Sequence, residues 1–135
     1  MPWFTIVRRR RVVRRRRSRR RATAKSKAEF TTLAPAARAL VHARLGYFNS
    51  YYGFTYKKVF IRNTRTRWGT CSALGNLSFN YRIVRLPPDL QDYIVGHELC
   101  HLAHLNHSKE FWNLVARALP NWKSLRRELK KHRLD

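Results

Sequence analysis

Two histidines and a glutamate in the second half of the chain are the residues best suited to chemistry, in the order His97-Glu98-Leu99-Cys100-His101. In an α-helix, side chains four residues apart leave the same face, so both imidazoles can bind one ion. Zinc binds imidazole nitrogens and, in catalytic sites, keeps one position open for water. A glutamate directly after the first histidine can take a proton from that water. We therefore expect a catalytic Zn²⁺ bound by His97 and His101, with Glu98 as the catalytic base.

The alternative interpretation is a pair of surface histidines on either side of an ordinary charged residue. Leu99 and Leu102 argue against it, because they place the same helix against a core. A glutamate on a buried helix needs a functional reason.

The third zinc ligand has several candidates. His104 follows the first histidine by seven residues, a rise of about 10.5 Å along a straight helix, so we expect it to support a ligand or to be exposed. His107 lies just after Asn106, a residue able to end the helix and turn the chain back towards the metal. Glu110 and Glu128 offer carboxylates from the following helices. The sequence favours His107 and leaves the two acids open.

Three further residues are candidates for substrate binding. Trp68 lies in a polar segment, where it is either a buried plug or part of a substrate wall, and core packing is favoured. Asn76 and Asn80 flank an expected strand before the active helix. An edge strand there can pair with an extended peptide, with the amides orienting its backbone. Ordinary turn and edge chemistry explains both asparagines equally well.

The two cysteines receive a simpler interpretation. Cys100 lies inside the histidine motif, but a small thiol at an inner helix position is more often core packing than a metal ligand, and Cys71 is interpreted in the same way. Two cysteines exclude a disulfide scaffold and indicate a reducing cytoplasm. We expect no transmembrane segment, because every apolar stretch is short and interrupted. The sequence does not indicate an oligomeric state.

Helices and strands must hold these residues in place. Apolar spacing and turn residues predict α+β layers. In chain order we expect a helix from Pro35 to Gly53, a strand over 56–63, a polar loop over 64–73, a turn at 74–76, a strand over 77–84, a helix from Asp89 to Asn106, a helix from Ser108 to Pro120 and a last amphipathic helix carrying Trp122, Leu125 and Leu129.

The charge of the chain is concentrated at its start. The 135 residues include 30 Lys and Arg against 7 Asp and Glu, a net charge of +23. Residues 1–27 hold more than half of this charge and no acid, which predicts a disordered or extended arm before a domain over 28–135. Guanidinium groups suit phosphate geometry, so we expect the arm to bind nucleic acid or another polyanion; the alternative is a solubilising tail. The arginines concerned are Arg8, Arg9, Arg10, Arg11, Arg14, Arg15, Arg16, Arg17, Arg19, Arg20 and Arg21.

Several motifs together resemble the YgjP-like metallopeptidase family, which is related to the SprT-like and WLM zinc proteases. They are Arg65–Ser72, Gly75-Asn76, Asn80–Arg82, Leu86–Pro88, His97–His101, Asn106–Ser108 and Phe111-Trp112. The resemblance implies a zincin-like α+β fold, with an N-terminal helix, a small mostly antiparallel sheet, the active helix and C-terminal helices. It also implies that His97, His101 and His107 hold the ion and that Glu98 is the catalytic base.

Three functions remain in order of preference. The first is a zinc metallopeptidase that the arm directs to a polyanion, by analogy with the SprT-like relatives that digest DNA-bound protein. The second is a zinc-dependent phosphohydrolase acting on nucleotides, which the basic surface would attract. The third is a nucleic-acid-binding module with structural zinc, which needs a fourth protein ligand such as Cys100.

Overall fold

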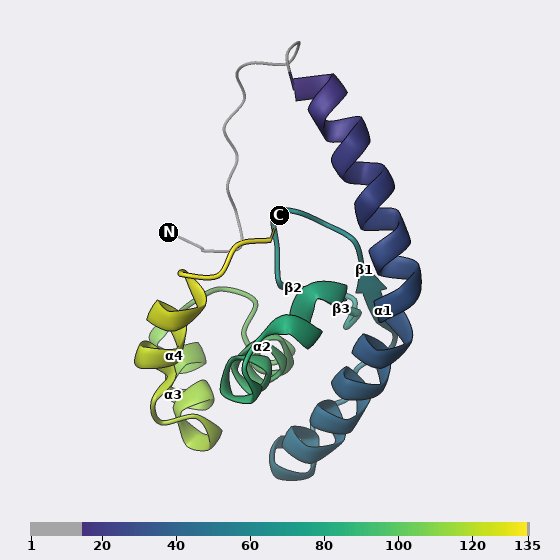
Figure 1. Cartoon of the computed structure of the whole chain (residues 1–135). Helices are drawn as coiled ribbons and strands as arrows, with labels where there is room; N and C mark the ends of the chain where they lie inside the picture. The colour runs from purple at the N-terminus through teal and green to yellow at the C-terminus, as the bar shows by residue number, and fades with distance from the viewer. Residues whose placement is uncertain (1–14, 135) are drawn as a thin grey trace.

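A computed structural model of the protein describes residues 15–134, with side chains from residue 24 onwards. The arginines expected to bind a polyanion, at positions 8–21, therefore lie outside the residues whose side chains are described. Figure 1 shows a long helix beside a small sheet, with a central helix and the C-terminal helices on its other side. The elements are α1 (Arg15–Tyr52), β1 (Val59–Arg62), β2 (Gly69–Cys71), β3 (Leu77–Asn80), the 3₁₀ helix η1 (Tyr81–Arg85), α2 (Pro88–Cys100), α3 (Lys109–Ala118) and α4 (Trp122–Leu129).

Helix α1 is much longer than the sequence predicted. It begins at Arg15 and contains Pro35, which was expected to be its first residue. Residues 15–27, expected as an extended arm, are helical. Arginine and alanine are good helix formers, and lengthening an existing helix is far easier than starting one. The C-terminal end follows the prediction, because Gly53 has φ 71° and its N–H donates to the Asn49 carbonyl at 2.7 Å.

Contacts upstream of Pro35 compensate for the backbone hydrogen bond that proline removes. Phe30 packs edge-on against Tyr81, with ring centroids 5.6 Å apart. Glu29 accepts hydrogen bonds from the Tyr81 hydroxyl at 3.0 Å and from Arg85 at 2.6 Å. Tertiary packing thus stabilises the turns of α1 before Pro35. A prediction based on the proline and its sequence neighbours alone does not include this contribution.

The sheet is mixed, which corrects the expectation of a mostly antiparallel one. Its order is β1-β3-β2, with β1 parallel to β3 and β2 antiparallel to β3. The strand β2 was expected as loop, because it has three residues and one of them is glycine. Within the described part of the chain, β2 lies at an edge of this sheet and β3 at its centre.

Strand β3 ends at Asn80, four residues earlier than predicted. The Asn80 side chain accepts a hydrogen bond from the backbone N–H of Arg82 at 3.0 Å and so caps η1. The apolar residues Ile83 and Val84 continue the strand pattern in sequence, but they belong to this 3₁₀ helix. Side-chain capping therefore outweighs β-propensity at this point.

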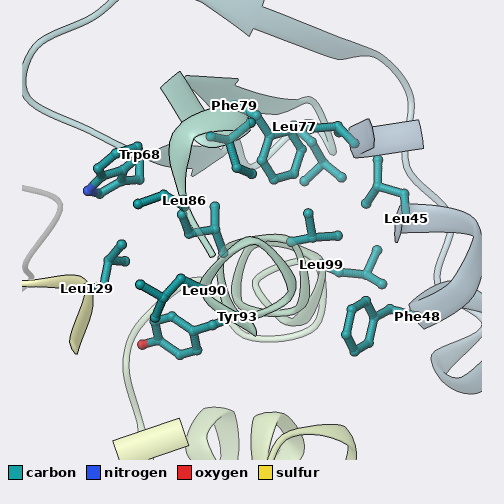
Figure 2. Close-up of a cluster of buried hydrophobic side chains, with 14 of the residues drawn as sticks. Leu45, Phe48, Trp68, Leu77, Phe79, Leu86, Leu90, Tyr93, Leu99 and Leu129 are labelled. Carbon is teal, nitrogen blue, oxygen red and sulfur yellow. The ribbon is translucent and has the colours of Figure 1, made fainter. Parts of the chain in front are cut away.

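Helix α2 lies at the centre of the core (Figure 2), where Leu45 and Phe48 approach from α1 and Leu129 from α4. Leu77 and Phe79 of β3 cover it from the sheet. The helices after α2 match the prediction, and Ser108 caps α3 by accepting a hydrogen bond from the Phe111 N–H at 3.2 Å. None of the helices in the described range is long and apolar enough to cross a membrane.

Candidate metal centre

His97 lies on the last turn of α2, and His101 is the C-cap residue that follows it. His97 is fully buried and His101 is 6% exposed, and their Nε2 atoms are 3.0 Å apart. The helix ends at Cys100, six residues before the predicted stop at Asn106. His104 is therefore not on the helix, and its backbone carbonyl accepts a hydrogen bond from His101 Nδ1 at 2.8 Å. A proton on Nδ1 leaves the Nε2 lone pair of His101 available for a metal.

His107 joins this pair from the turn before α3. Its Nε2 lies 3.2 Å from Nε2 of His97, and the ligand atoms of all three histidines lie within 4.8 Å of one another. Glu110 is exposed, and Glu128 is exposed and pairs with Lys131 at 3.1 Å. Neither acid belongs to the group, so the structure brings together the favoured set of residues rather than the carboxylate alternatives.

Aromatic rings pack against the histidines. Phe111 stacks on His101 with centroids 4.3 Å apart, and Trp112 stacks on His107 at 5.6 Å. Trp122 of α4 then stacks on Trp112 at 4.0 Å. The sequence predicted these residues as the inner faces of their helices, but helix periodicity carries no signal for their contact with the imidazoles.

The chemistry of this group fits a metal ion. Burial, together with His101 and His107, holds the pKa of His97 well below its usual range, and burial lowers the pKa values of His101 and His107 in the same way. All three imidazoles are consequently neutral at pH 7, the form that binds metals. Three nitrogens at these separations are the donor set of a divalent transition metal.

Glu98 lies beside the three nitrogens and is 1% exposed. Its Oε1 is 4.0 Å from Nε2 of His97, and neither carboxylate oxygen has a hydrogen-bond partner within residues 15–134. Burial raises the pKa of Glu98 well above its usual range, and the charge of Arg67 partly opposes this. A buried carboxyl group with an elevated pKa and free oxygens is suited to accept and return a proton.

Gly69 is a site residue that the sequence reasoning missed. A Cβ atom at this position would lie 2.9 Å from Glu98 Cγ and 3.2 Å from the Ser78 carbonyl oxygen. The edge strand β2 therefore approaches Glu98 more closely than a side chain would allow. A glycine directly after a tryptophan, inside a polar segment, was the only available signal.

Comparison with known proteins agrees with this geometry. The sequence matches the YgjP-like metallopeptidase domain over residues 5–132. The chain belongs to this family. No curated protein matches it. The crystal structure of the metallopeptidase zymogen of Pyrococcus abyssi abylysin shares its fold, with a TM-score of 0.61 and 24% identity over 67% of this chain and 92% of abylysin.

This member of the YgjP-like family has a groove next to its histidines. The groove has a volume of about 570 Å³ and reaches from His101 to the turn between β2 and β3. Leu74 and Leu105 line this groove and are 69% and 56% exposed. The groove therefore places open space with two exposed leucines directly beside His101.

The three residues predicted for substrate binding make structural contacts. Trp68 is 6% exposed and packs in the core, as its packing interpretation expects. Asn80 is on the central strand rather than an edge, is 1% exposed, and donates to the carbonyls of Thr64 at 2.6 Å and Arg67 at 3.1 Å. Asn76 accepts a hydrogen bond from the Lys58 N–H at 3.2 Å. Both asparagines thus form hydrogen bonds that stabilise turns and loops, as the alternative interpretation expects.

Both cysteines are free thiols outside the histidine group. Cys100 is buried, and burial raises its pKa to about 12 although a hydrogen bond with Tyr52 of α1 opposes this. Burial and the nearby Glu98 likewise raise the pKa of Cys71 to about 12. Within residues 24–134 the converging group contains no sulfur, so no cysteine closes the site.

Proposed function

We propose that this metallopeptidase is zinc-dependent and hydrolyses peptide bonds, with His97, His101 and His107 holding the ion and Glu98 as the catalytic base. One observation carries the proposal: three histidine Nε2 atoms converge beside a buried, unpartnered carboxyl group. Tetrahedral zinc ligands at 2.0–2.1 Å lie about 3.3 Å apart, close to the separations of 3.0 and 3.2 Å seen here.

Zinc, when bound, supplies Lewis acidity that polarises the scissile carbonyl and acidifies water. The protein supplies the rest. Glu98 accepts the proton of the attacking water and returns it to the leaving amine, a transfer that its raised pKa favours. The carbonyl of His104 fixes the tautomer of His101, and the stacked rings of Phe111 and Trp112 fix the orientation of the imidazoles.

The free edge of β2 is the element best placed to bind the substrate backbone. It starts at Gly69, whose backbone approaches Glu98, and ends beside the groove that reaches His101. A peptide that pairs with this edge as an additional strand would pass directly over the catalytic carboxyl group. The proposal therefore keeps the predicted mode of peptide binding but moves it from the strand at Asn80 to β2.

The decisive experiment is the Glu98→Gln variant, assayed for peptide hydrolysis and for zinc content. We expect a loss of roughly 10²–10⁴-fold in kcat with one zinc ion still bound, because the amide cannot accept the proton. Glu110→Gln removes the same charge from an exposed site and serves as the matched control. Full activity of Glu98→Gln would refute the mechanism. Parallel assays with casein and with nucleoside triphosphates distinguish a peptidase from a phosphohydrolase.

We further propose that the arginines at positions 8–21 bind a polyanion such as nucleic acid. The support is their density: eleven guanidinium groups with no acid among residues 1–27. Replacing Arg14–Arg17 by glutamine in the full chain should weaken DNA binding and flatten its dependence on salt. Unchanged affinity would contradict the proposal.

We also propose that the protein works in a reducing cytoplasm, because its two cysteines are free thiols.

A further inference from the structure

A second pocket, of about 310 Å³, lies on the outer face of the sheet. Leu77 and Phe79 of β3 point into the core, so Ser78 points to the opposite face. Thr70 is paired with Ser78 and shares that face. Arg62, Thr64, Thr66 and Arg67 line the pocket together with these residues, and Gly69, Phe79 and Asn80 make up the rest of its lining.

The pocket is rich in hydrogen-bond donors and has no acid. None of the six acidic residues at positions 24–134 lines it. Within the described residues, neither Arg62 nor Arg67 forms an ion pair. Arg62 lies over the ring of Phe60 at 4.4 Å, so its guanidinium is placed by stacking rather than by an anion. Two unpaired guanidinium groups beside threonine and serine hydroxyls form a site for an oxyanion.

The turn that carries Arg67 is fixed by hydrogen bonds from buried side chains. Asn80 donates to the carbonyls of Thr64 and Arg67, and Thr64 Oγ1 donates to the Arg67 carbonyl at 3.2 Å. Arg82, 3% exposed, donates from Nη1 to the Thr64 carbonyl at 3.0 Å. No ion pair neutralises Arg82 within residues 24–134, so it adds positive charge beneath the turn. Donors that are fixed before binding lose less entropy when a ligand arrives.

The position of the pocket connects it with the substrate. Gly69 lines the pocket and also contacts Glu98. Arg67 precedes Gly69 by two residues, so their backbones lie at most about 7 Å apart. Alternate side chains of a peptide paired with β2 would lie on the face of Thr70, next to this pocket.

We infer that the pocket formed by Arg62, Arg67, Thr66, Thr70 and Ser78 binds a carboxylate of the substrate peptide, within about three residues of the scissile bond. This inference rests on the proposed peptidase function. The carboxylate belongs either to an acidic side chain or to the C-terminus of the peptide. The enzyme would thereby prefer acidic peptides. This preference would come from Arg62 and Arg67 rather than from the N-terminal segment, which holds more than half of the net charge.

The test uses the zinc-loaded full chain and amidated peptides that differ only by glutamate or glutamine at one position near the scissile bond. At one of these positions glutamate should raise kcat/KM by about tenfold, the combined effect of two partly exposed guanidinium groups. The ratio should fall close to one in Arg62→Gln/Arg67→Gln. It should persist in Arg65→Gln, because Arg65 belongs to the same turn but does not line the pocket. An unchanged ratio in the double variant overturns the inference.

A binding measurement separates this inference from the proposed function. In Glu98→Gln, fluorescence anisotropy should show about tenfold tighter binding of the glutamate peptide, or of a peptide with a free C-terminus if that is the carboxylate bound. A wild-type enzyme that cleaves no peptide refutes the peptidase proposal, and the anisotropy still decides on the pocket. Equal affinity for all of these peptides overturns the inference even where cleavage is normal.

Discussion

Replacing Gly69 by alanine should impair catalysis more than it impairs folding. The new Cβ would lie 2.9 Å from Glu98 Cγ and 3.3 Å from its Cδ, whereas carbon atoms in ordinary contact are about 3.5 Å apart or more. On the other side, the Ser78 carbonyl oxygen at 3.2 Å belongs to the backbone of the paired strand β3. Because the strand is the stiffer neighbour, Glu98 is the group that must move.

The expected magnitude follows from that displacement. Restoring an ordinary contact moves the Glu98 side chain by at least about half an ångström, and a misplacement of about 1 Å typically costs a hundredfold in rate. We therefore expect kcat to fall by roughly 10- to 100-fold. Overpacking of this kind also lowers the free energy of unfolding by about 1–3 kcal/mol. Zinc content should be unchanged, because the three atoms nearest to the new Cβ belong to Glu98 and Ser78 and not to a histidine.

The assay measures kcat and KM for a cleaved peptide, zinc stoichiometry and urea unfolding for the same preparation. Gly46→Ala is the matched control, since a Cβ there meets nothing within 4 Å and alanine is the better helix former by about 1 kcal/mol. It should retain full activity and gain stability. A Gly69→Ala enzyme with kcat within threefold of the wild type would refute the reasoning that this close approach positions Glu98.

Three further outcomes follow from the structure. His107→Ala should weaken zinc binding by at least about a hundredfold, whereas Glu110→Ala and Glu128→Ala should leave it unchanged in a competition titration with a chelator; the reverse would reassign the third ligand. Asn80→Ala should lower the free energy of unfolding by about 2–3 kcal/mol, because the Thr64 and Arg67 carbonyls lose a buried donor; a loss below about 0.5 kcal/mol in urea would contradict this. Metal-free Glu98→Gln, which lacks the opposing carboxyl group, should lose stability as the pH falls from 6.5 towards 4. Burial, and secondly the charge of His101, lowers the pKa of His107 to about 4 in the folded state. Between pH 6.5 and 4 the unfolded chain therefore binds more protons than the folded chain, and the free energy of unfolding falls. A urea midpoint that stays constant over this pH range would contradict the prediction.

The sequence was sufficient for the elements whose signals are local. The caps of η1 and α3 and the left-handed Gly53 are short-range features, and two of the three were recognised in the correct place. Asn80 shows the difficulty with the third, because its capping hydrogen bond competes with a strand pattern that continues through Val84. A local pattern cannot decide between two locally plausible structures.

The errors in the fold arise from contacts between distant residues. Pro35 is a good first residue of a helix, and the packing of Phe30 and Glu29 against η1 helps to extend α1 past it. The parallel pairing of β1 with β3 depends on a crossover that strand patterns do not encode. In the site, the spacing of the histidines anticipated their convergence, whereas the contact between Gly69 and Glu98 joins residues 29 positions apart.

The three histidines contact aromatic residues that are close to them in sequence, whereas Glu98 contacts Gly69, which is distant from it in sequence. All three imidazoles, and the rings of Phe111 and Trp112 behind them, come from a stretch of sixteen consecutive residues. Contacts this close in sequence form early and cost little chain entropy, whereas the approach of Gly69 to Glu98 waits for the sheet to dock. We therefore expect a partly folded chain to bind its metal ion before it can hydrolyse peptides. During biosynthesis such a chain would acquire its metal before it could cut any protein around it.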